Sequence, residues 1–135
     1  MMCRILSAVL LSSCLCAASQ GHESPIDAAS LDQTNMSSVL GTKVTVIGNV
    51  IKVKTPRSQD AVIIDFHPDW QSHLSVLIPQ SLLPQIPDTE SLLGKRIQVT
   101  GIVLEYKGQI GHNLVHKPEI ILESIEQLVI MEPRQ

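Results

Sequence analysis

Apolar and polar residues alternate along two similar stretches of the chain. Residues 38–50 match residues 91–103 at an offset of 53 positions, and each stretch alternates up to a central glycine, Gly48 or Gly101. Just beyond each glycine two apolar residues stand side by side, and such a slip of the period is typical of a bulge or a sharp bend. The repeat therefore predicts two long strands of similar shape, each bent at its central glycine.

Three shorter stretches are further strand candidates. They cover residues 61–66, 74–78 and 119–123, the last continuing to residue 130, and each is expected to form a strand. The first places Val62, Ile64 and Phe66 on one face, which we expect to point inward, and the second places Leu74, Val76 and Ile78 on one face. Pro84 and Pro87 limit residues 81–93 to short helical pieces. Five strands with a short helical segment between strands 3 and 4 predict an all-β fold, a five-stranded OB-fold barrel. An SH3-like barrel is the alternative, whereas the prolines and the alternation exclude a helical bundle.

Residues 1–19 predict an export signal. One charged residue, Arg4, precedes a short apolar run that ends at Ser12, and small residues follow, which is the layout of a secretory signal peptide. The sequence Leu-Ser-Ser-Cys that ends at Cys14 resembles the bacterial lipobox, whose cysteine is lipidated and becomes the first mature residue. Ordinary cleavage near Ser19 is the alternative. We therefore expect a lipoprotein on the periplasmic face of a bacterial membrane, or a protein free in the periplasm.

Composition and charge complete the domain organisation. The chain has 135 residues, 44% of them hydrophobic, which is enough for one packed domain. We expect a polar tether over residues 20–37, the barrel over residues 38–131 and a short tail over residues 132–135. All three cysteines lie within the signal, so the folded part is expected to hold no disulfide and no thiolate metal site. The net charge of −3 excludes a generally basic nucleic-acid coat protein and permits a local basic patch.

Several short motifs follow one another along residues 41–128, about two thirds of the chain. They are Gly-x-Lys-Val-x-Val-x-Gly-x-Val (41–50), Thr-Pro-Arg-Ser (55–58), Asp-Phe (65–66), Val-x-Ile-Pro (76–79), Gly-Lys-Arg-Ile-x-Val-x-Gly (94–101), Tyr-Lys-Gly (106–108) and Pro-Glu-Ile (118–120). The series resembles the OB-fold nucleic-acid-binding domains of the tRNA-anticodon-binding type, which occur in small nucleic-acid-binding lipoproteins of bacteria. Members of that family run directly from Tyr-Lys-Gly to Pro-Glu-Ile, whereas residues 109–117 lengthen this loop here.

The resemblance implies binding of single-stranded nucleic acid, or of another polyanion, along strands 2 and 3 and between loops 1–2 and 4–5. Phosphate contacts are expected from the basic residues beside those loops, and base stacking from two aromatic residues. The predicted site comprises Lys52, Lys54, Arg57, Trp70, Tyr106, Lys107 and Lys117. The outward residues predicted for strands 2 and 3 are neither basic nor aromatic; they are Ile63, Asp65, Ser75 and Leu77. The lysines therefore have a second interpretation as solubilising strand ends. In that case the protein is a cell-envelope interaction module that binds a protein partner.

Two histidines form a weaker candidate site. The spacing of His112 and His116 would place both rings on one face of a helix, as in zinc and copper sites. The glycines at 108 and 111 argue against a helix, so we expect surface histidines and no cofactor. The sequence also lacks a serine elbow, a glycine-rich phosphate loop and a His-Glu-x-x-His motif. We therefore expect no enzyme activity.

Overall fold

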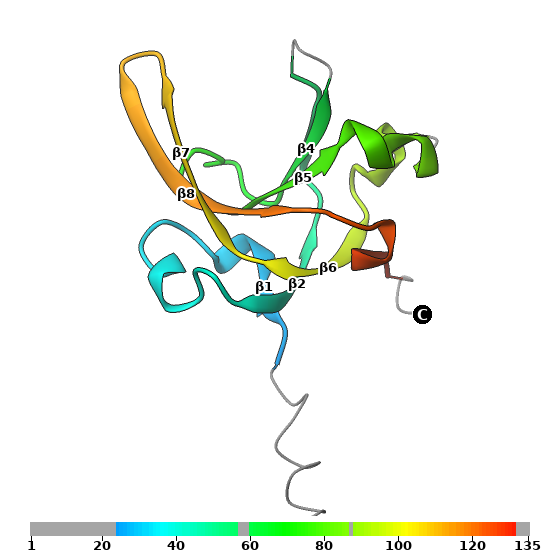
Figure 1. Cartoon of the computed structure of the whole chain (residues 1–135), viewed down its shortest axis with the longest axis horizontal. Coiled ribbons are helices and arrows are strands. Elements are labelled where there is room, and N and C mark those ends of the chain that lie inside the picture. Colours follow the sequence, from blue (N-terminus) through cyan, green and yellow to red (C-terminus); the bar gives the residue numbers. More distant parts are fainter. Residues whose placement is uncertain (1–23, 57–59, 87, 132–135) are drawn as a thin grey trace, which may run out of the picture.

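The strands form two sheets that share the long strands of the sequence repeat (Figure 1). The computed structural model describes residues 24–56, 60–86 and 88–131, and within them one sheet has the order β1-β2-β6-β9 and the other the order β3-β4-β5-β8-β7. The strands are Ile26–Asp27 (β1), Lys43–Asn49 (β2), Lys52–Lys54 (β3), Ala61–Asp65 (β4), Ser75–Pro79 (β5), Arg96–Ile102 (β6), Leu104–Ile110 (β7), Asn113–Ile121 (β8) and Leu128–Ile130 (β9). The prediction of an all-β chain is confirmed. In the described ranges the strands do not join into one closed barrel, because their pairing divides them between two sheets.

The two copies of the repeat bend in the same way. The first passes from β2 into β3 at Val50, the second passes from β6 into β7 at Val103, and both valines are buried. The carbonyl of Val50 accepts from the N–H of Gly94 at 2.8 Å, and the carbonyl of Val103 accepts from the N–H of Gly41, also at 2.8 Å. Each long strand therefore serves both sheets, as the sequence predicts, with the break two residues beyond the central glycine.

The core lies on one face of the five-stranded sheet and against β2 and β6. Alternate residues of β4, β5 and β8 point inward, and β2 and β6 close the core from the other side. Its members include Val46, Val62, Ile64, Phe66, Val76, Ile78, Ile97, Val99 and Ile120. The inward face expected for residues 61–66, including Phe66, is therefore confirmed.

The segment predicted as a polar tether begins the folded domain instead. Within residues 24–37, β1 pairs in parallel with β2, and the 3₁₀ turns Ala28–Ser30 (η1) and Met36–Ser38 (η2) follow. Ala28, Leu31 and Met36 are buried, so the tether prediction is wrong for this part. A Cβ at Gly48 would lie 2.7 Å from the Cβ of Ala28, so Gly48 leaves the space in which this segment packs.

The stretch predicted as a long loop after Tyr-Lys-Gly is a hairpin. Strands β7 and β8 pair along seven residues around a two-residue turn at Gly111 and His112, where Gly111 has a φ of +62°. Figure 1 shows the tip of this hairpin projecting from the rest of the molecule. Its outer half has solvent on both faces and therefore lacks an apolar period, which explains why the loop prediction is wrong.

Short 3₁₀ helices make up the remaining regular structure. Gln80–Gln85 (η3) and Thr89–Leu92 (η4) lie between β5 and β6, where the sequence predicts short helical pieces. Ile125–Gln127 (η5) separates β8 from β9, so the final predicted strand divides into two. Among the described residues no helix has the length and hydrophobicity needed to cross a membrane.

Candidate functional site

The face of the five-stranded sheet that points away from the core is named the outer face. Strand register places one set of alternating residues on it: Lys52, Lys54, Ile63, Asp65, Ser75, Leu77, Leu104, Tyr106, Lys117, Glu119 and Ile121. The expectation that Ile63, Asp65, Ser75 and Leu77 point outward is therefore confirmed. Lysines from both ends of the sheet thus share one surface with an aromatic ring from β7.

A buried polar network crosses this face. The Nζ of Lys54 lies 2.9 Å from the Oδ2 of Asp65, and the hydroxyl of Ser75 donates to the Oδ1 of Asp65 at 2.6 Å. The Nζ of Lys117 donates at 2.6 Å both to the Oγ of Ser75 and to the carbonyl of Trp70. These five residues are named the lysine–tryptophan cluster. They connect β3, β4, β5 and β8 to the loop that carries Trp70.

The ring of Trp70 covers the network. The Nζ of Lys54 lies 3.5 Å from the ring centroid and that of Lys117 lies 5.2 Å away. Aromatic faces attract cations, and more strongly where water is excluded. Asp65 is 1% exposed and Lys117 is 4% exposed. The tryptophan is therefore held by two ammonium groups and by its own carbonyl, which favours a rigid platform.

Burial shifts the proton affinity of two groups on the outer face. It lowers the pKa of Lys117, with the charge of Lys54 adding to the shift and Asp65 and Glu119 opposing it. Burial likewise raises the pKa of Glu119, and Lys117 opposes that rise. Both charged forms are poorly hydrated here. An anionic ligand group beside Lys117 would favour its protonated form.

A small cavity lies beside the cluster. Its volume is about 120 Å³, and its lining consists of Lys54, Ile63, Trp70, Ser75, Leu77, Tyr106, Lys117 and Glu119. Tyr106 is 37% exposed and lies at the cavity on β7, the edge strand of this sheet. A planar apolar group between the two aromatic side chains would meet aliphatic side chains, two ammonium groups and the carboxyl group of Glu119. The arrangement suits a ring that carries, or adjoins, a negative charge.

The structure brings together four of the seven residues predicted for ligand binding. Lys54, Trp70, Tyr106 and Lys117 share the cavity, and Lys52 lies on the same face at its edge. Lys117 is predicted as a loop residue for phosphate contact, but it lies in β8 with its ammonium group already hydrogen-bonded. The prediction that residue 117 lies in a loop is therefore wrong, because this segment is a strand.

Two other predicted residues do not join the cavity. Lys107 alternates with Tyr106 along β7 and therefore points to the opposite face, where its Nζ lies 4.0 Å from the Oε1 of Glu105. Arg57 lies outside the described residues, as does Cys14. Sequence reasoning also missed the joint role of Asp65 and Ser75. The signal was present, since both were expected on the outward face of neighbouring strands.

The two histidines considered as weak metal candidates are both exposed. His112 lies in the hairpin turn, whereas His116 lies in β8 with its Nδ1 3.1 Å from the Oε2 of Glu105. No helix therefore places the two rings on one face, in agreement with the argument from the glycines at 108 and 111. Two other rings, His67 and His73, stack with their centroids 3.6 Å apart. In the part of the chain that the structure describes, no three His, Cys, Asp or Glu side chains are grouped to hold a metal ion.

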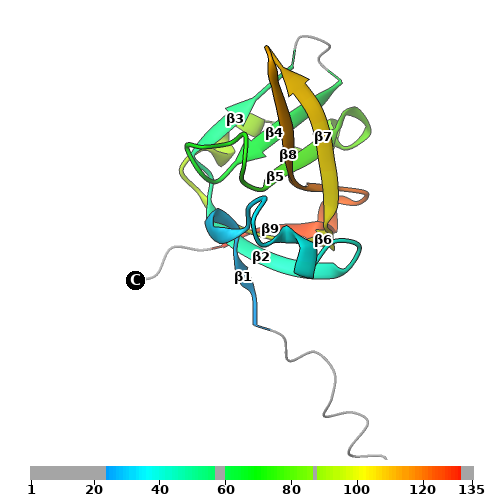
Figure 2. The same cartoon turned by 90° about the vertical axis from the view of Figure 1, so that its left-hand side faces the viewer.

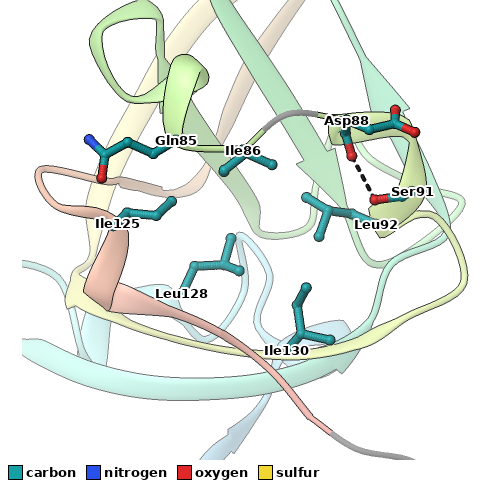
Figure 3. Close-up of a pocket in the computed structure, with 8 residues that line it drawn as sticks. All are labelled: Gln85, Ile86, Asp88, Ser91, Leu92, Ile125, Leu128 and Ile130. Carbon is teal, nitrogen blue, oxygen red and sulfur yellow. Dashed lines mark hydrogen bonds between the residues drawn. The ribbon is translucent and has the colours of Figure 1, made fainter.

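A larger pocket lies on the other side of the core. It has a volume of about 420 Å³ and lies between the η3–η4 segment and the η5–β9 segment. Figure 3 shows Ile86, Leu92, Ile125, Leu128 and Ile130 pointing toward one another across it. The hydroxyl of Ser91 donates to the carbonyl of Asp88 at 2.6 Å at its margin. Its lining contains neither an aromatic ring nor a lysine, so the cavity of the outer face is the stronger candidate for a charged ligand.

Comparison with known proteins adds no relative. No protein-family model matches the chain, and no curated protein matches it. The function is therefore inferred from the geometry of the outer face.

Proposed function

We propose that the domain is an OB-fold whose outer face binds single-stranded nucleic acid. The strand order supports the fold assignment when β2 with β3 is taken as strand 1 and β6 with β7 as strand 4. The chain then has the sheet order 1-2-3-5-4, and β5 pairs in parallel with β8. OB-folds are partly open five-stranded barrels that use the face of strands 2 and 3 for ligands. The outer face contains that surface.

The observation that carries the ligand assignment is the cavity between Trp70 and Tyr106. Bases stack on aromatic side chains regardless of sequence, and each stack contributes about 1–3 kcal/mol. Lys54 and Lys117 line the same cavity, and Lys52 lies next along β3 toward solvent. We assign a base to the cavity and its adjoining phosphate to Lys52, whose side chain is exposed.

This assignment predicts binding with a modest dependence on salt. Each lysine that neutralises a phosphate of a single strand contributes about 0.7 to the slope of affinity against salt on logarithmic axes. Lys117 and Lys107 are not expected to contribute, because one is internally hydrogen-bonded and the other points away. The salt slope should therefore be smaller than the slope expected if all five basic residues of the predicted site contacted phosphates.

A titration of labelled single-stranded oligonucleotides, followed by fluorescence anisotropy at several salt concentrations, tests the assignment. Tyr106→Ala should weaken binding by about 1–3 kcal/mol with little change in salt slope, since stacking is not ionic. Lys52→Ala should lower the slope by about 0.7. The matched control is Lys107→Ala on the opposite face of the hairpin, which should leave both quantities unchanged. Equal effects of Lys52→Ala and Lys107→Ala would contradict the proposed phosphate path.

A second candidate is an envelope interaction module that binds a protein partner. It is favoured by exposed apolar side chains where β6 passes into β7, since Ile102 is 50% exposed and Leu104 is 42% exposed. Together with Ile121 they line a groove of about 660 Å³ that also contains Lys43 and Glu123. Absence of oligonucleotide binding at low salt would favour this candidate over the first.

We propose an exported, lipid-anchored and non-enzymatic role for either candidate. The support is the signal-like segment and the lipobox-like sequence that ends at Cys14. Bacterial lipid modification supplies several acyl chains, so the protein should remain with the membrane through a salt wash. Mass spectrometry of the membrane fraction would identify a lipidated N-terminus at Cys14. A soluble form that begins near Gln20 would contradict the anchor.

A further inference from the structure

Strand β7 forms one edge of the five-stranded sheet. Within the described residues it pairs with β8 along Leu104–Ile110, and its other side has no strand partner. Figure 2 shows β7 along one margin of the molecule, on the side away from β3 and β4. An exposed edge of this length offers a template for another strand.

The hairpin geometry determines which backbone groups of β7 point to the open side. In a hairpin with a two-residue turn, the flanking residues Ile110 and Asn113 form a hydrogen-bonded pair, and such pairs then alternate along the ladder. Even-numbered residues of β7 therefore direct their N–H and C=O groups at β8. Pro118, which has no N–H, lies opposite Glu105 and fits the pattern. Glu105, Lys107 and Gln109 direct their backbone groups toward the open edge.

Val103 supports this assignment from the preceding residue. Its N–H donates to the carbonyl of Thr42 at 3.1 Å, and its carbonyl accepts from the N–H of Gly41 at 2.8 Å. The backbone groups of odd-numbered residues here thus point away from β8. At Val103 residues 41–42 accept and donate these hydrogen bonds, and further along β7 the same side has no strand partner in the described residues. Any added strand must hydrogen-bond to the odd-numbered residues.

Charge then distinguishes between the registers open to a second copy of β7. An antiparallel pair centred on Glu105 would place two carboxylates opposite each other, and one centred on Lys107 would place two ammonium groups opposite each other. A pair centred on Tyr106 places Glu105 opposite Lys107 of the second copy. By symmetry it also places Lys107 opposite Glu105 of the second copy. It also places Leu104 opposite Gly108. Opposite charges across strands stabilise a pair and like charges destabilise it.

The side chains of the outer face fit the same register. A Cβ at Gly108 would lie 2.7 Å from the Cζ of Tyr106, so the tyrosine ring lies over this glycine. The position opposite Leu104 is therefore flat and presents an aromatic surface. Leu104 and Tyr106 are 42% and 37% exposed, and pairing would bury the edge of each side chain that faces the added strand while leaving the outer face open.

We propose that β7 pairs antiparallel with β7 of a second copy of this chain, centred on Tyr106, to form a two-fold symmetric dimer. Such an interface is isologous, with the same residues on both sides. It joins the two five-stranded sheets edge to edge. The proposal uses the free edge and its charges, and it holds whichever ligand the outer face takes.

Charge reversal tests the register. Sedimentation of the purified chain over a wide concentration series should show a monomer–dimer equilibrium. Glu105→Lys or Lys107→Glu should each weaken dimerisation by about tenfold or more, because both cross-strand pairs then join like charges. Mixing the two single variants in equal amounts should restore a dimer, because every lysine of one chain then faces a glutamate of the other. Unchanged circular dichroism would establish that each variant folds.

A cross-linking experiment provides an independent readout. Tyr106→Cys would bring two cysteines together across the two-fold axis at a non-hydrogen-bonded pair, where Cα atoms lie about 4.5 Å apart. Oxidation should give a covalent dimer, whereas Gln109→Cys should not cross-link. The unsubstituted chain controls for Cys3, Cys14 and Cys16. A monomeric wild type, dimerisation unaffected by either reversal, or failure of the mixed pair to associate would overturn the proposal.

Discussion

The two copies of the sequence repeat fold alike up to the same point and then differ. Gly41 and Gly94 precede β2 and β6 with φ values of +79° and +83°. Val50 and Val103 then mark the passage from one sheet to the other with equivalent hydrogen bonds. The repeat thus builds a nearly two-fold symmetric frame, in which β2 and β6 pair along seven residues.

The continuations of the two copies carry different chemistry. The first continues as β3, where Lys54 forms an ion pair with the buried Asp65 and lies over Trp70. The second continues as the longer edge strand β7, where Lys107 is 67% exposed beside Glu105. The two similar copies therefore continue into different charge pairs. The pair on β3 has a buried carboxylate, whereas the pair on β7 is exposed to solvent. The proposed ligand cavity takes Lys54 from the first continuation and Tyr106 from the second, whereas the proposed edge pairing uses the second alone.

The largest expected effect is the loss of the buried carboxylate. Asp65→Asn keeps the shape of the side chain but leaves Lys54 and Lys117 without the anion between them. Breaking a buried pair by removing one partner destabilises a protein by about 3–5 kcal/mol. Because Lys54 retains some access to water, we expect the lower end, roughly 3 kcal/mol, in urea unfolding followed by circular dichroism.

The matched change on the second continuation is Glu105→Gln. Exposed ion pairs contribute about 0–1 kcal/mol, so the free energy of unfolding should fall by no more than that. Comparable losses in Asp65→Asn and Glu105→Gln would mean that the two continuations do not differ in the way described.

The next effect concerns the central glycines, where the two copies should respond alike. A Cβ at Gly48 would lie 2.7 Å from that of Ala28, and one at Gly101 would lie 2.6 Å from the Cγ2 of Ile120. Gly48→Val and Gly101→Val should each destabilise by about 1–3 kcal/mol through overpacking. Thermal unfolding measures both effects. If the thermal midpoint falls in neither variant, a side chain at these two glycines does not crowd the core.

A double variant separates crowding from other effects at the first glycine. Ala28→Gly removes the methyl group that a new side chain at Gly48 would meet. Gly48→Ala combined with Ala28→Gly should therefore recover part of the stability lost in Gly48→Ala alone. Additive losses in the double variant would contradict the packing argument.

The sequence predicts the frame well because its residues obey one local period. Val46 and Val99 alternate with polar neighbours, and the two sheets bury them as expected. The sequence did not predict strands in the outer half of the hairpin, because both of its faces meet solvent. Its residues, among them Gln109 and Asn113, therefore do not alternate between apolar and polar. Ala28 was missed because a single 3₁₀ turn leaves no period to detect.

The candidate site is predicted less completely, because its geometry depends on contacts between distant segments. Tyr106 and Trp70 are predicted as stacking residues, and the structure places both at one cavity. Local sequence does not indicate that Lys117 donates to the carbonyl of Trp70, 47 residues away. Lys117 is buried as well as hydrogen-bonded there, which the loop prediction for this segment did not indicate.

A smaller and more symmetric effect is expected at the glycines that open each copy. At Gly41 and Gly94 an added Cβ would meet nothing within 4 Å, so only the positive φ opposes a side chain. Left-handed backbone costs an ordinary residue about 1 kcal/mol. Gly41→Ala and Gly94→Ala should therefore lower the free energy of unfolding by about that amount, and equally. A marked difference between the two values in urea unfolding would break the two-fold relation.

The last effect is a change in the slope of unfolding free energy against pH. It distinguishes the buried Lys117 of β8 from the exposed Lys107 of β7. Burial lowers the pKa of Lys117 from its ordinary value of 10.5. Between the two values the unfolded chain holds the extra proton, so the free energy of unfolding should rise with pH across that interval. Lys117→Met abolishes this contribution, whereas Lys107→Met controls for the loss of one positive charge from the same hairpin.

The measurement is urea unfolding of the wild type and of both variants from neutral pH to about pH 10.5. Wild-type stability relative to Lys117→Met should increase toward the alkaline end, because deprotonation of Lys117 relieves the burial of its charge. Comparison with Lys107→Met removes effects that any lost lysine would produce. A wild-type curve that stays parallel to Lys117→Met throughout would mean that the ammonium group of Lys117 is as well solvated in the folded chain as in the unfolded one. The lysine–tryptophan cluster would then not be the water-excluded platform that the ligand assignment requires.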